Sequence, residues 1–328
     1  MTARLLEVKD LRVSFSTPDG MVEAVRGVSF SVDRGKTLGI VGESGSGKSV
    51  ATQTMVGLTR GARVAGKALF DGQDLLRMTA NELRGVRGRG IAMIFQNPLS
   101  SLHPYYSIGW QIEEMIRAHE SLTKAQARSR AIDLLGRVGI ARPEKRVDEY
   151  PHQFSGGMLQ RAMIAMAIAL NPRLIVADEP TTALDATVQA QIVRLLRKLQ
   201  DEFHSAIILI THDLGVVAEI ADDVMVMYAG MAMEHATRLE LFRRPSHPYT
   251  EGLLSSLPRL DATRSRLTPI PGQPPSLIDP PAGCPFHPRC SKVLDRCSQE
   301  TPPFIAVPNA EQHQSACWLV GEGSNGCS

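Results

Sequence analysis

The chain has 328 residues, 43% of them hydrophobic and 21% charged, which suits a folded protein with one large domain and a smaller one. Its formal net charge of +2 gives no electrostatic argument for a nucleic-acid partner. It contains no run of 18 apolar residues and has charges among its first ten residues, so it predicts neither a membrane span nor a secretion signal. We therefore expect a cytosolic chain.

Two strands are predicted at the start of the chain. Residues 5–15 alternate apolar and polar side chains, which is typical of an edge-type strand. Residues 22–32 alternate in the same way after a turn at 17–20, and they predict the second strand of a hairpin. Phe15 ends the first strand. The pattern alone favours a phenylalanine that packs in the core, and stacking on a nucleotide base is the alternative.

The glycine-rich stretch at 42–49, GESGSGKS, lies between an apolar run and a helical pattern. Strand, glycine loop and helix in this order form the context of a phosphate-binding loop. Gly42 and Gly47 allow a tight turn with inward N–H groups, which form an anion site with the helix N-terminus. Lys48 is expected to reach the terminal phosphates of a nucleoside triphosphate, and the Ser49 hydroxyl to bind Mg²⁺. The residues expected to contact the nucleotide are Gly42, Ser44, Gly45, Ser46, Gly47, Lys48, Ser49 and Val50.

Further strands and a helical segment follow this loop. Residues 67–75 predict a strand with a turn, and the apolar run 91–98 predicts a strand covered on both faces, as in a parallel sheet. Gln96 lies near the end of this run, where ligands bind in α/β sheets, so it is a candidate contact for Mg²⁺ or the attacking water. A plain loop residue is the alternative. Residues 100–150 carry helical patterns and no strand signal, which indicates a helical insertion.

A serine and two glycines precede the next helix. Ser155 is placed as its N-cap, and Gly156 and Gly157 follow directly. A helix N-terminus next to glycines is another possible phosphate site. The alternative is an ordinary helix cap without a ligand.

Two acidic residues end the next apolar strand, predicted at 174–180. Buried paired acids are costly unless they bind a metal or catalyse a reaction. Asp178 is therefore predicted to hold Mg²⁺, and Glu179 to act as the general base for water. A helix is expected from about Asp185 to residue 203.

The last two strands of the predicted sheet lie at 206–213 and 224–230, and the second is expected to close the sheet. His212 ends the first of them. It is a candidate donor to the γ-phosphate of the nucleotide, and a capping or core histidine is the alternative.

In this order, over about residues 5–240, the motifs resemble the ATPase cassette of ABC transporters. The resemblance implies an α/β P-loop NTPase fold with a mixed sheet core, an antiparallel β edge and a helical subdomain at about 97–170. It also implies an ATPase that uses ATP and Mg²⁺ to drive transmembrane import. The implied catalytic residues are Glu179, His212 and Gln96, the implied Mg²⁺ contacts are Ser49, Gln96 and Asp178, and Phe15 corresponds to the aromatic residue that stacks on adenine.

The resemblance further implies a dimer in which a signature motif clamps the ATP of the opposite subunit. The signature and the loop that communicates across the dimer correspond to Ser155, Gly156, Gly157, Met158, Gln160 and Asp185. The family often has glutamine where this chain has Met158, which puts a side-chain contact from that position in doubt but not the backbone and serine contacts.

Residues 241–328 are predicted to form a C-terminal extension beyond the 1–240 cassette. Its proline-rich segment 268–281 predicts an extended arm rather than a packed core. Disulfides are not expected in a reducing compartment. Zinc sites usually contain closer cysteine pairs, whereas an iron–sulfur cluster takes wider spacing, so iron–sulfur, zinc and no metal all remain open. The candidate ligands are Cys284, Cys290, Cys297 and Cys317, and Cys327 has no expected role.

Residues 247–250, His-Pro-Tyr-Thr, resemble the oligopeptide/dipeptide/nickel importer branch of the family, and its D-type ATPase in particular. That resemblance implies a [4Fe-4S] cluster, with Zn²⁺ as the alternative, and peptides as the cargo. It implies two permease subunits, a second homologous ATPase, an extracytoplasmic solute-binding protein, no nucleic acid, and a peripheral location at the cytoplasmic face of the membrane. The alternatives are nickel or another small solute as cargo, a soluble non-transport ABC ATPase, and a homologue that binds ATP without hydrolysing it.

Overall fold

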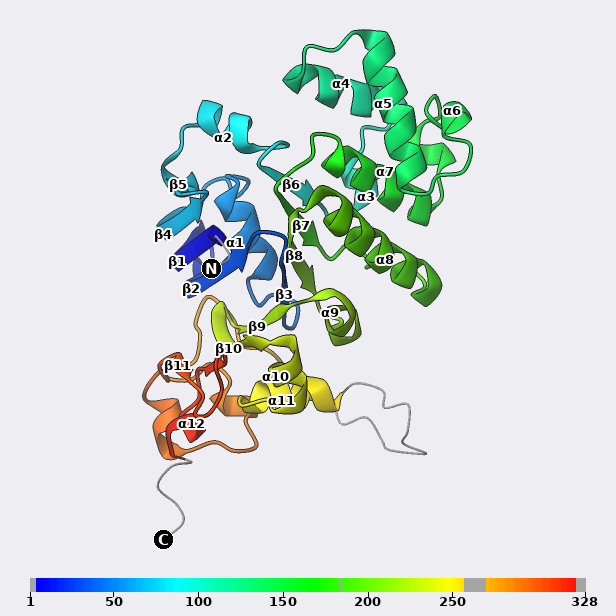
Figure 1. The fold of residues 1–328 in the computed structure, drawn as a ribbon. Helices are drawn as coiled ribbons and strands as arrows, with labels where there is room; N and C mark the ends of the chain where they lie inside the picture. The colour runs from blue at the N-terminus through cyan, green and yellow to red at the C-terminus, as the bar shows by residue number, and fades with distance from the viewer. Residues whose placement is uncertain (1–3, 183, 257–269, 323–328) are drawn as a thin grey trace. The chain divides into compact units, whose positions relative to one another are not determined.

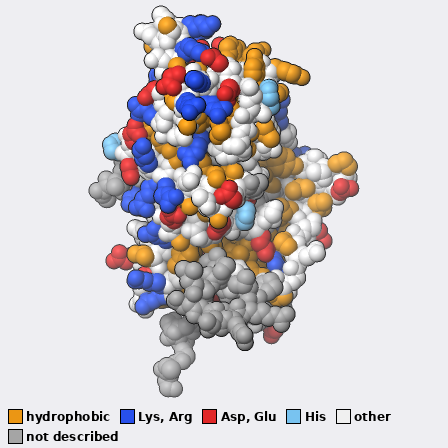
Figure 2. Space-filling model, turned by 90° about the vertical axis from the view of Figure 1, so that its right-hand side faces the viewer, with side chains coloured by type: hydrophobic (Ala, Val, Ile, Leu, Met, Phe, Trp, Pro, Cys, Tyr) orange, Lys and Arg blue, Asp and Glu red, His pale blue; other side chains and the backbone are white. Residues whose placement is uncertain are grey.

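The computed structural model describes residues 4–182, 184–256 and 270–322. It divides into two compact units, and each is described by itself. The first unit comprises Asp33–Lys36 and Met78–Ile210, and the second comprises Arg4–Val32, Thr37–Arg77 and the described residues from Thr211 onward. None of the described helices is both long and apolar enough to cross a membrane. On the face shown in Figure 2, acidic and basic side chains are interspersed.

The first unit contains a parallel sheet and most of the helices. Strands β6, β7 and β8 pair in parallel, with Ile91 opposite Leu174 and Leu174 opposite Ala206. Every residue of β7 and β8 is buried, as expected for continuous apolar strands covered on both faces. The elements are α2 (Ala80–Val86), β6 (Ile91–Ile94), α3 (Pro98–Ser101), α4 (Ile108–His119), α5 (Lys124–Arg137), α6 (Pro143–Arg146), η2 (Pro151–Gln153), α7 (Gly156–Ile168), β7 (Leu174–Asp178), α8 (Ala186–Phe203) and β8 (Ala206–Thr211).

The predicted helical insertion is confirmed. Residues 95–173, all of them described, hold helices and no strand, and helices α4, α5, α6 and α7 lie together (Figure 1). Strand β6 ends at Ile94, four residues before the predicted end. The chain leaves the sheet there because the Asn97 side chain accepts a hydrogen bond from the Leu99 N–H and caps α3, whose first residue is a proline.

The second unit begins with an antiparallel sheet in the order β2, β1, β4, β5. The prediction of β1 as an edge strand is wrong, because β4 pairs with it on the side opposite β2. Its inward-facing residues Leu6, Val8, Leu11 and Val13 are buried. Up to Arg77, the elements of this unit are β1 (Arg4–Thr17), β2 (Gly20–Asp33), β3 (Thr37–Val41), α1 (Lys48–Met55), β4 (Arg63–Phe70), β5 (Gln73–Asp74) and η1 (Leu75–Arg77).

The strand predicted at 224–230 does not close the sheet. Strand β9 pairs in parallel with β3, and the chain then reverses through Ala229 and Gly230, both at positive φ, into the antiparallel β10. Two consecutive residues at positive φ form the short turn that hairpins favour. The elements of this part are α9 (Leu214–Ile220), β9 (Asp223–Tyr228), β10 (Met231–Thr237), α10 (Arg238–Arg243), α11 (Pro248–Ser255), η3 (His287–Arg289), η4 (Asp295–Ser298), β11 (Ile305–Ala306), β12 (Gln314–Ser315) and α12 (Leu319–Glu322).

The C-terminal extension packs on the core of the second unit. Tyr249, Cys284 and Phe286 share one buried cluster with Tyr228 of β9, and the extension lies beside β10 and α10 in Figure 1. The described part of the proline-rich arm, residues 270–281, has neither helix nor strand, as predicted. It is nevertheless packed, because Leu277 contacts this cluster and its carbonyl accepts a hydrogen bond from the Glu23 N–H at 3.0 Å.

Candidate nucleotide-binding site and cysteine cluster

The glycine loop joins β3 to α1 in the second unit and has the backbone that a phosphate cradle requires. Gly42 has φ 155° and Gly47 has φ 93°. A Cβ atom would lie 2.1 Å from the Met227 carbonyl oxygen at Gly42 and 2.2 Å from the Ala24 carbonyl oxygen at Gly47. Only glycine fits either position. The loop thus presents the N-terminus of α1 as an anion site.

Lys48 places its ammonium group inside this loop. Its Nζ donates to the carbonyl oxygens of Gly42 and Glu43, at 2.8 Å each, and lies 3.3 Å from the Ser46 hydroxyl. The residue is only 5% exposed, whereas Ser44 and Gly45 are exposed. A buried positive charge therefore lies beside backbone groups that face solvent, which suits binding of a phosphate chain.

Two other predicted residues of this unit lie apart from the loop in sequence. Phe15 is half-buried on β1, and His212 is exposed just before α9. Their roles in nucleotide binding stay predictions.

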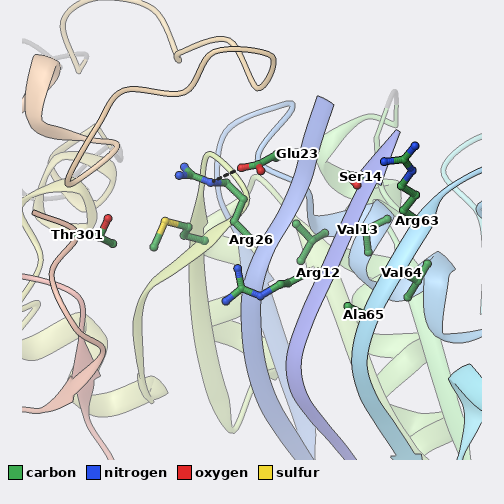
Figure 3. A pocket seen from close by; sticks show the side chains of 11 residues that line it. Arg12, Val13, Ser14, Glu23, Arg26, Arg63, Val64, Ala65 and Thr301 are labelled. Atoms are coloured by element: carbon green, nitrogen blue, oxygen red, sulfur yellow. Dashed lines mark ion pairs between the residues drawn. The ribbon is translucent and has the colours of Figure 1, made fainter. Parts of the chain in front are cut away.

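A separate pocket of about 460 Å³ is formed largely by β1, β2 and β4 (Figure 3). Arg12, Arg26 and Arg63 make its lining basic, and Glu23 pairs with Arg26 at 3.3 Å. Phe15 is not among the described residues that line it, so this pocket does not supply the predicted base-stacking site.

The first unit brings Gln96 and Glu179 together. The Gln96 Nε2 donates to Glu179 Oε2 at 2.9 Å, and the Thr182 hydroxyl donates to the same oxygen at 2.8 Å. Glu179 has φ 46°, which is strained for a non-glycine residue, and Asp178 before it is only 3% exposed. Thr182 was not predicted from the sequence, because no periodicity or motif marks it.

The serine-glycine motif begins α7 of the same unit. Ser155 caps the helix by accepting from the Met158 N–H at 3.4 Å, and it is exposed. A Cβ atom on Gly157 would lie 3.0 Å from Val188 of α8, so glycine lets the two helices approach each other.

Gln160 and Asp185, both predicted dimer contacts, differ in exposure to solvent. Gln160 is only 2% exposed, and its Nε2 has no hydrogen-bond partner among the described residues. Asp185 is exposed and caps α8 by accepting from the Val188 N–H at 3.0 Å.

The four predicted cysteine ligands line one cavity of about 20 Å³ in the second unit. All four are free thiols. Burial, and then the neighbouring cysteines, raise the pKa of Cys284 to about 11. The described residues contain no group of three or more His, Cys, Asp or Glu side chains arranged to hold a metal ion. Cys327 lies outside the described residues.

Comparison with known proteins adds the family. Residues 25–182 match the model of the ABC transporter family, and residues 233–297 match that of the oligopeptide/dipeptide transporter C-terminal region. The oligopeptide transport ATP-binding protein OppD of Bacillus subtilis is 50% identical over 321 residues, which cover 97% of this chain and 89% of that protein. The chain belongs to the ABC transporter family, in its oligopeptide/dipeptide branch.

Further ABC proteins are similar to this chain in sequence and in fold. The dipeptide transport ATP-binding protein DppD of Bacillus subtilis is 49% identical over 319 residues, covering 96% of this chain and 95% of that protein. A solved dimeric ATP-binding cassette bound to ADP and Pi has a TM-score of 0.65 and 26% identity, over 71% of this chain and 98% of that one. The cbiO1 protein of Clostridium perfringens, part of an ABC transporter complex, has a TM-score of 0.63 and 28% identity, over 74% of this chain and 91% of that one. The predicted ABC cassette fold is thereby confirmed.

Proposed function

We propose that this chain is the ATP-hydrolysing motor subunit of a membrane importer for di- or oligopeptides. Membership of the ABC family makes it an ATPase. The peptide cargo is supported by the names of OppD and DppD, which it matches over nearly its whole length. The main structural support for ATP binding is the glycine loop, because the buried ammonium of Lys48 points into it.

The proposed chemistry assigns each site residue a task. Lys48 and the loop amides bind the phosphates of ATP, and Ser49 and Gln96 ligate Mg²⁺ with support from Asp178. Glu179 polarises the attacking water. The hydrogen bonds from Gln96 and Thr182 support that role, because they fix the orientation of the Glu179 carboxylate. His212 contacts the γ-phosphate, and Phe15 stacks on the adenine.

Replacing Glu179 by glutamine tests the assignment. The Glu179→Gln variant is expected to retain ATP binding and to lose hydrolysis by about 10²-fold or more, because the general base is removed. Binding and turnover are measured on the purified protein with its partner ATPase. Glu202→Gln is the control, since Glu202 pairs with Arg137 at the surface of the same unit. Unchanged hydrolysis in Glu179→Gln contradicts the assignment.

We also propose the partners of this subunit. Two cassettes, this chain and a second homologous ATPase, sandwich ATP between the glycine loop of one and the Ser155 signature of the other. Closure on ATP and reopening after hydrolysis then drive two permease subunits at the cytoplasmic face of the membrane. A solute-binding protein delivers the cargo, and nucleic acid takes no part. The net charge of +2 and the interspersed charges on the face shown in Figure 2 support that exclusion.

The proposed docking surface for the permease subunits lies in the helical segment of the first unit. Leu99 is 60% exposed and Tyr105 is 82% exposed. Tyr106 is also exposed and stacks on Trp110, with ring centroids 4.0 Å apart. An exposed group of large apolar and aromatic side chains is typical of a protein contact.

The cysteine cluster is proposed to bind a [4Fe-4S] cluster, with Zn²⁺ as the alternative. Support comes from four thiols on one cavity, from their number, and from their chemistry as iron ligands. The bound metal would keep these thiols deprotonated. Anaerobically purified protein is expected to be brown, with iron and acid-labile sulfide, and Cys290→Ser to bleach it, whereas Cys327→Ser is the control. Colourless protein with stoichiometric zinc contradicts the iron–sulfur assignment.

The cargo is tested separately from the ATPase. Uptake of labelled dipeptides, longer peptides and Ni²⁺ by vesicles with the reconstituted transporter distinguishes peptide import from the nickel alternative. ATP-dependent uptake of Ni²⁺ or another small solute without peptide uptake would overturn the peptide proposal and leave the ATPase assignment intact.

A further inference from the structure

Glu43 is the acidic residue of the glycine loop, and each of its polar groups makes a hydrogen bond within the second unit. Its N–H donates to the Tyr249 hydroxyl at 2.9 Å, and its carbonyl accepts from Lys48 Nζ at 2.8 Å. Its carboxylate receives two hydrogen bonds from Arg289, Nη1 to Oε2 at 2.6 Å and Nη2 to Oε1 at 3.0 Å. Arg289 and Tyr249 both belong to the C-terminal extension.

Arg289 is itself fixed in place. Its side chain is only 6% exposed, its Nε donates to the Pro271 carbonyl at 2.8 Å, and its Nη1 donates to the Tyr228 hydroxyl at 3.1 Å. A buried guanidinium with two parallel hydrogen bonds to a carboxylate is a geometrically specific pair. The extension therefore contacts the glycine loop through a rigid connection.

The contact leaves the mouth of the loop open. Ser44 and Gly45 are exposed, and a cavity of about 330 Å³ separates the loop from the arm at Pro274–Ile278. The extension thus touches the loop at Glu43 and leaves Ser44 and Gly45 exposed, which suits a role in binding rather than in blocking.

The charge of Glu43 is the reason for this arrangement. The loop is built for phosphates, and an uncompensated carboxylate beside them repels the ligand. The paired guanidinium neutralises this carboxylate and fixes its position through two hydrogen bonds.

We propose that Arg289 is a positioning residue for ATP binding, which acts by neutralising and orienting Glu43 of the glycine loop. This inference rests on the proposed nucleotide binding at that loop. It makes the C-terminal extension part of the machinery that sets the affinity for ATP.

ATP affinity of charge variants tests the proposal. Binding of a fluorescent ATP analogue is measured on the full chain for wild type, Arg289→Gln, Glu43→Gln and the double variant. Arg289→Gln is expected to weaken binding roughly tenfold, since it leaves a like charge near the phosphates. The double variant is expected to recover most of that loss, because the repelling carboxylate is gone.

Two further variants separate this role from a structural one. Arg289→Lys keeps the charge but loses the paired hydrogen bonds, and it is expected to weaken binding about threefold. Lys292→Gln is the control, because Lys292 pairs with Glu251 at the surface of the same extension.

Each outcome has one interpretation. The inference is overturned if both Arg289→Gln and Arg289→Lys bind the ATP analogue with wild-type affinity. It is also overturned if the double variant binds the analogue as weakly as Arg289→Gln does. If Arg289→Gln does not fold, Arg289→Lys alone decides. If wild type itself fails to bind the analogue, the proposed function fails rather than this inference.

Discussion

Two glycines of the nucleotide loop share a positive φ but differ in the space around them. Gly47 has φ 93° and a Cβ there would lie 2.2 Å from the Ala24 carbonyl oxygen, whereas Gly45 has φ 77° and nothing within 4 Å. Gly47→Ala is expected to lose ATP binding and to lower the free energy of unfolding by about 3 kcal/mol, the sum of strain and clash. Gly45→Ala should cost about 1 kcal/mol and keep binding. Urea unfolding and nucleotide titration measure both, and equal effects of the two variants contradict this reading.

At this same scale, motifs predict residues whose roles depend on neighbours in the chain. Lys48 and Gly47 belong to one short pattern, and in the structure Lys48 Nζ donates to the Gly42 carbonyl while a Cβ atom at Gly47 would clash with the Ala24 carbonyl oxygen. Contacts between distant residues were not predictable. Arg289 and Glu43 are 246 positions apart, and the left-handed backbone of Glu179 depends on its N–H bonding the Ile210 carbonyl in the neighbouring strand.

Among the elements, strand β10 was not predicted, because a buried acid lies between its buried apolar residues Met233 and Ala236. Glu234 is fully buried in this strand, and its carboxylate accepts from the N–H groups of Ser246 and His247 and contacts His313 at 2.6 Å. All three partners come later in the sequence. A buried acid breaks the alternation that predicts a strand, so only the folded chain reveals the compensation.

A buried histidine of the same strand should make the stability of the protein depend on pH. His235 of β10 has an Nε2 sealed from water with no partner among the described residues, and burial, followed by nearby His313, lowers its pKa to about 4 from 6.5. The unfolded chain then binds this proton below pH 6.5 and the folded chain only near pH 4. The free energy of unfolding should therefore fall as the pH is lowered through that window, by at most about 3 kcal/mol from this residue.

Comparison of wild type with His235→Gln isolates this contribution. Urea unfolding at pH 7.5, 6.0 and 4.5 should show a smaller loss of stability in the variant. Parallel pH profiles for the two proteins would rule out His235 as a source of the acid sensitivity.

For the whole molecule, the compact units differ from the sequence division at residue 240. The second unit joins the first strands of the chain to the extension, through contacts such as Glu23 with Leu277 and Glu43 with Arg289. Composition marks where proline and cysteine content changes, but it carries no information on which surface the extension packs against. The domain boundary at residue 240 therefore stays a prediction, and it did not indicate that the extension packs against the first strands of the chain.

The cysteine cluster and the nucleotide loop are connected through Arg289 within the second unit. Arg289 lies in the short turn His287–Arg289 between Cys284 and Cys290, and the Cys284 N–H donates to the Cys297 carbonyl at 2.8 Å. If the cluster binds a metal as proposed, its removal frees this turn and loosens Arg289 from Glu43. Anaerobic chelation should then weaken ATP binding several-fold in wild type, and leave Arg289→Gln/Glu43→Gln unchanged, because the connection is already absent there. Titration of the ATP analogue before and after chelation measures the effect. An equal loss of affinity in both proteins would mean that the metal acts on the nucleotide loop by another route.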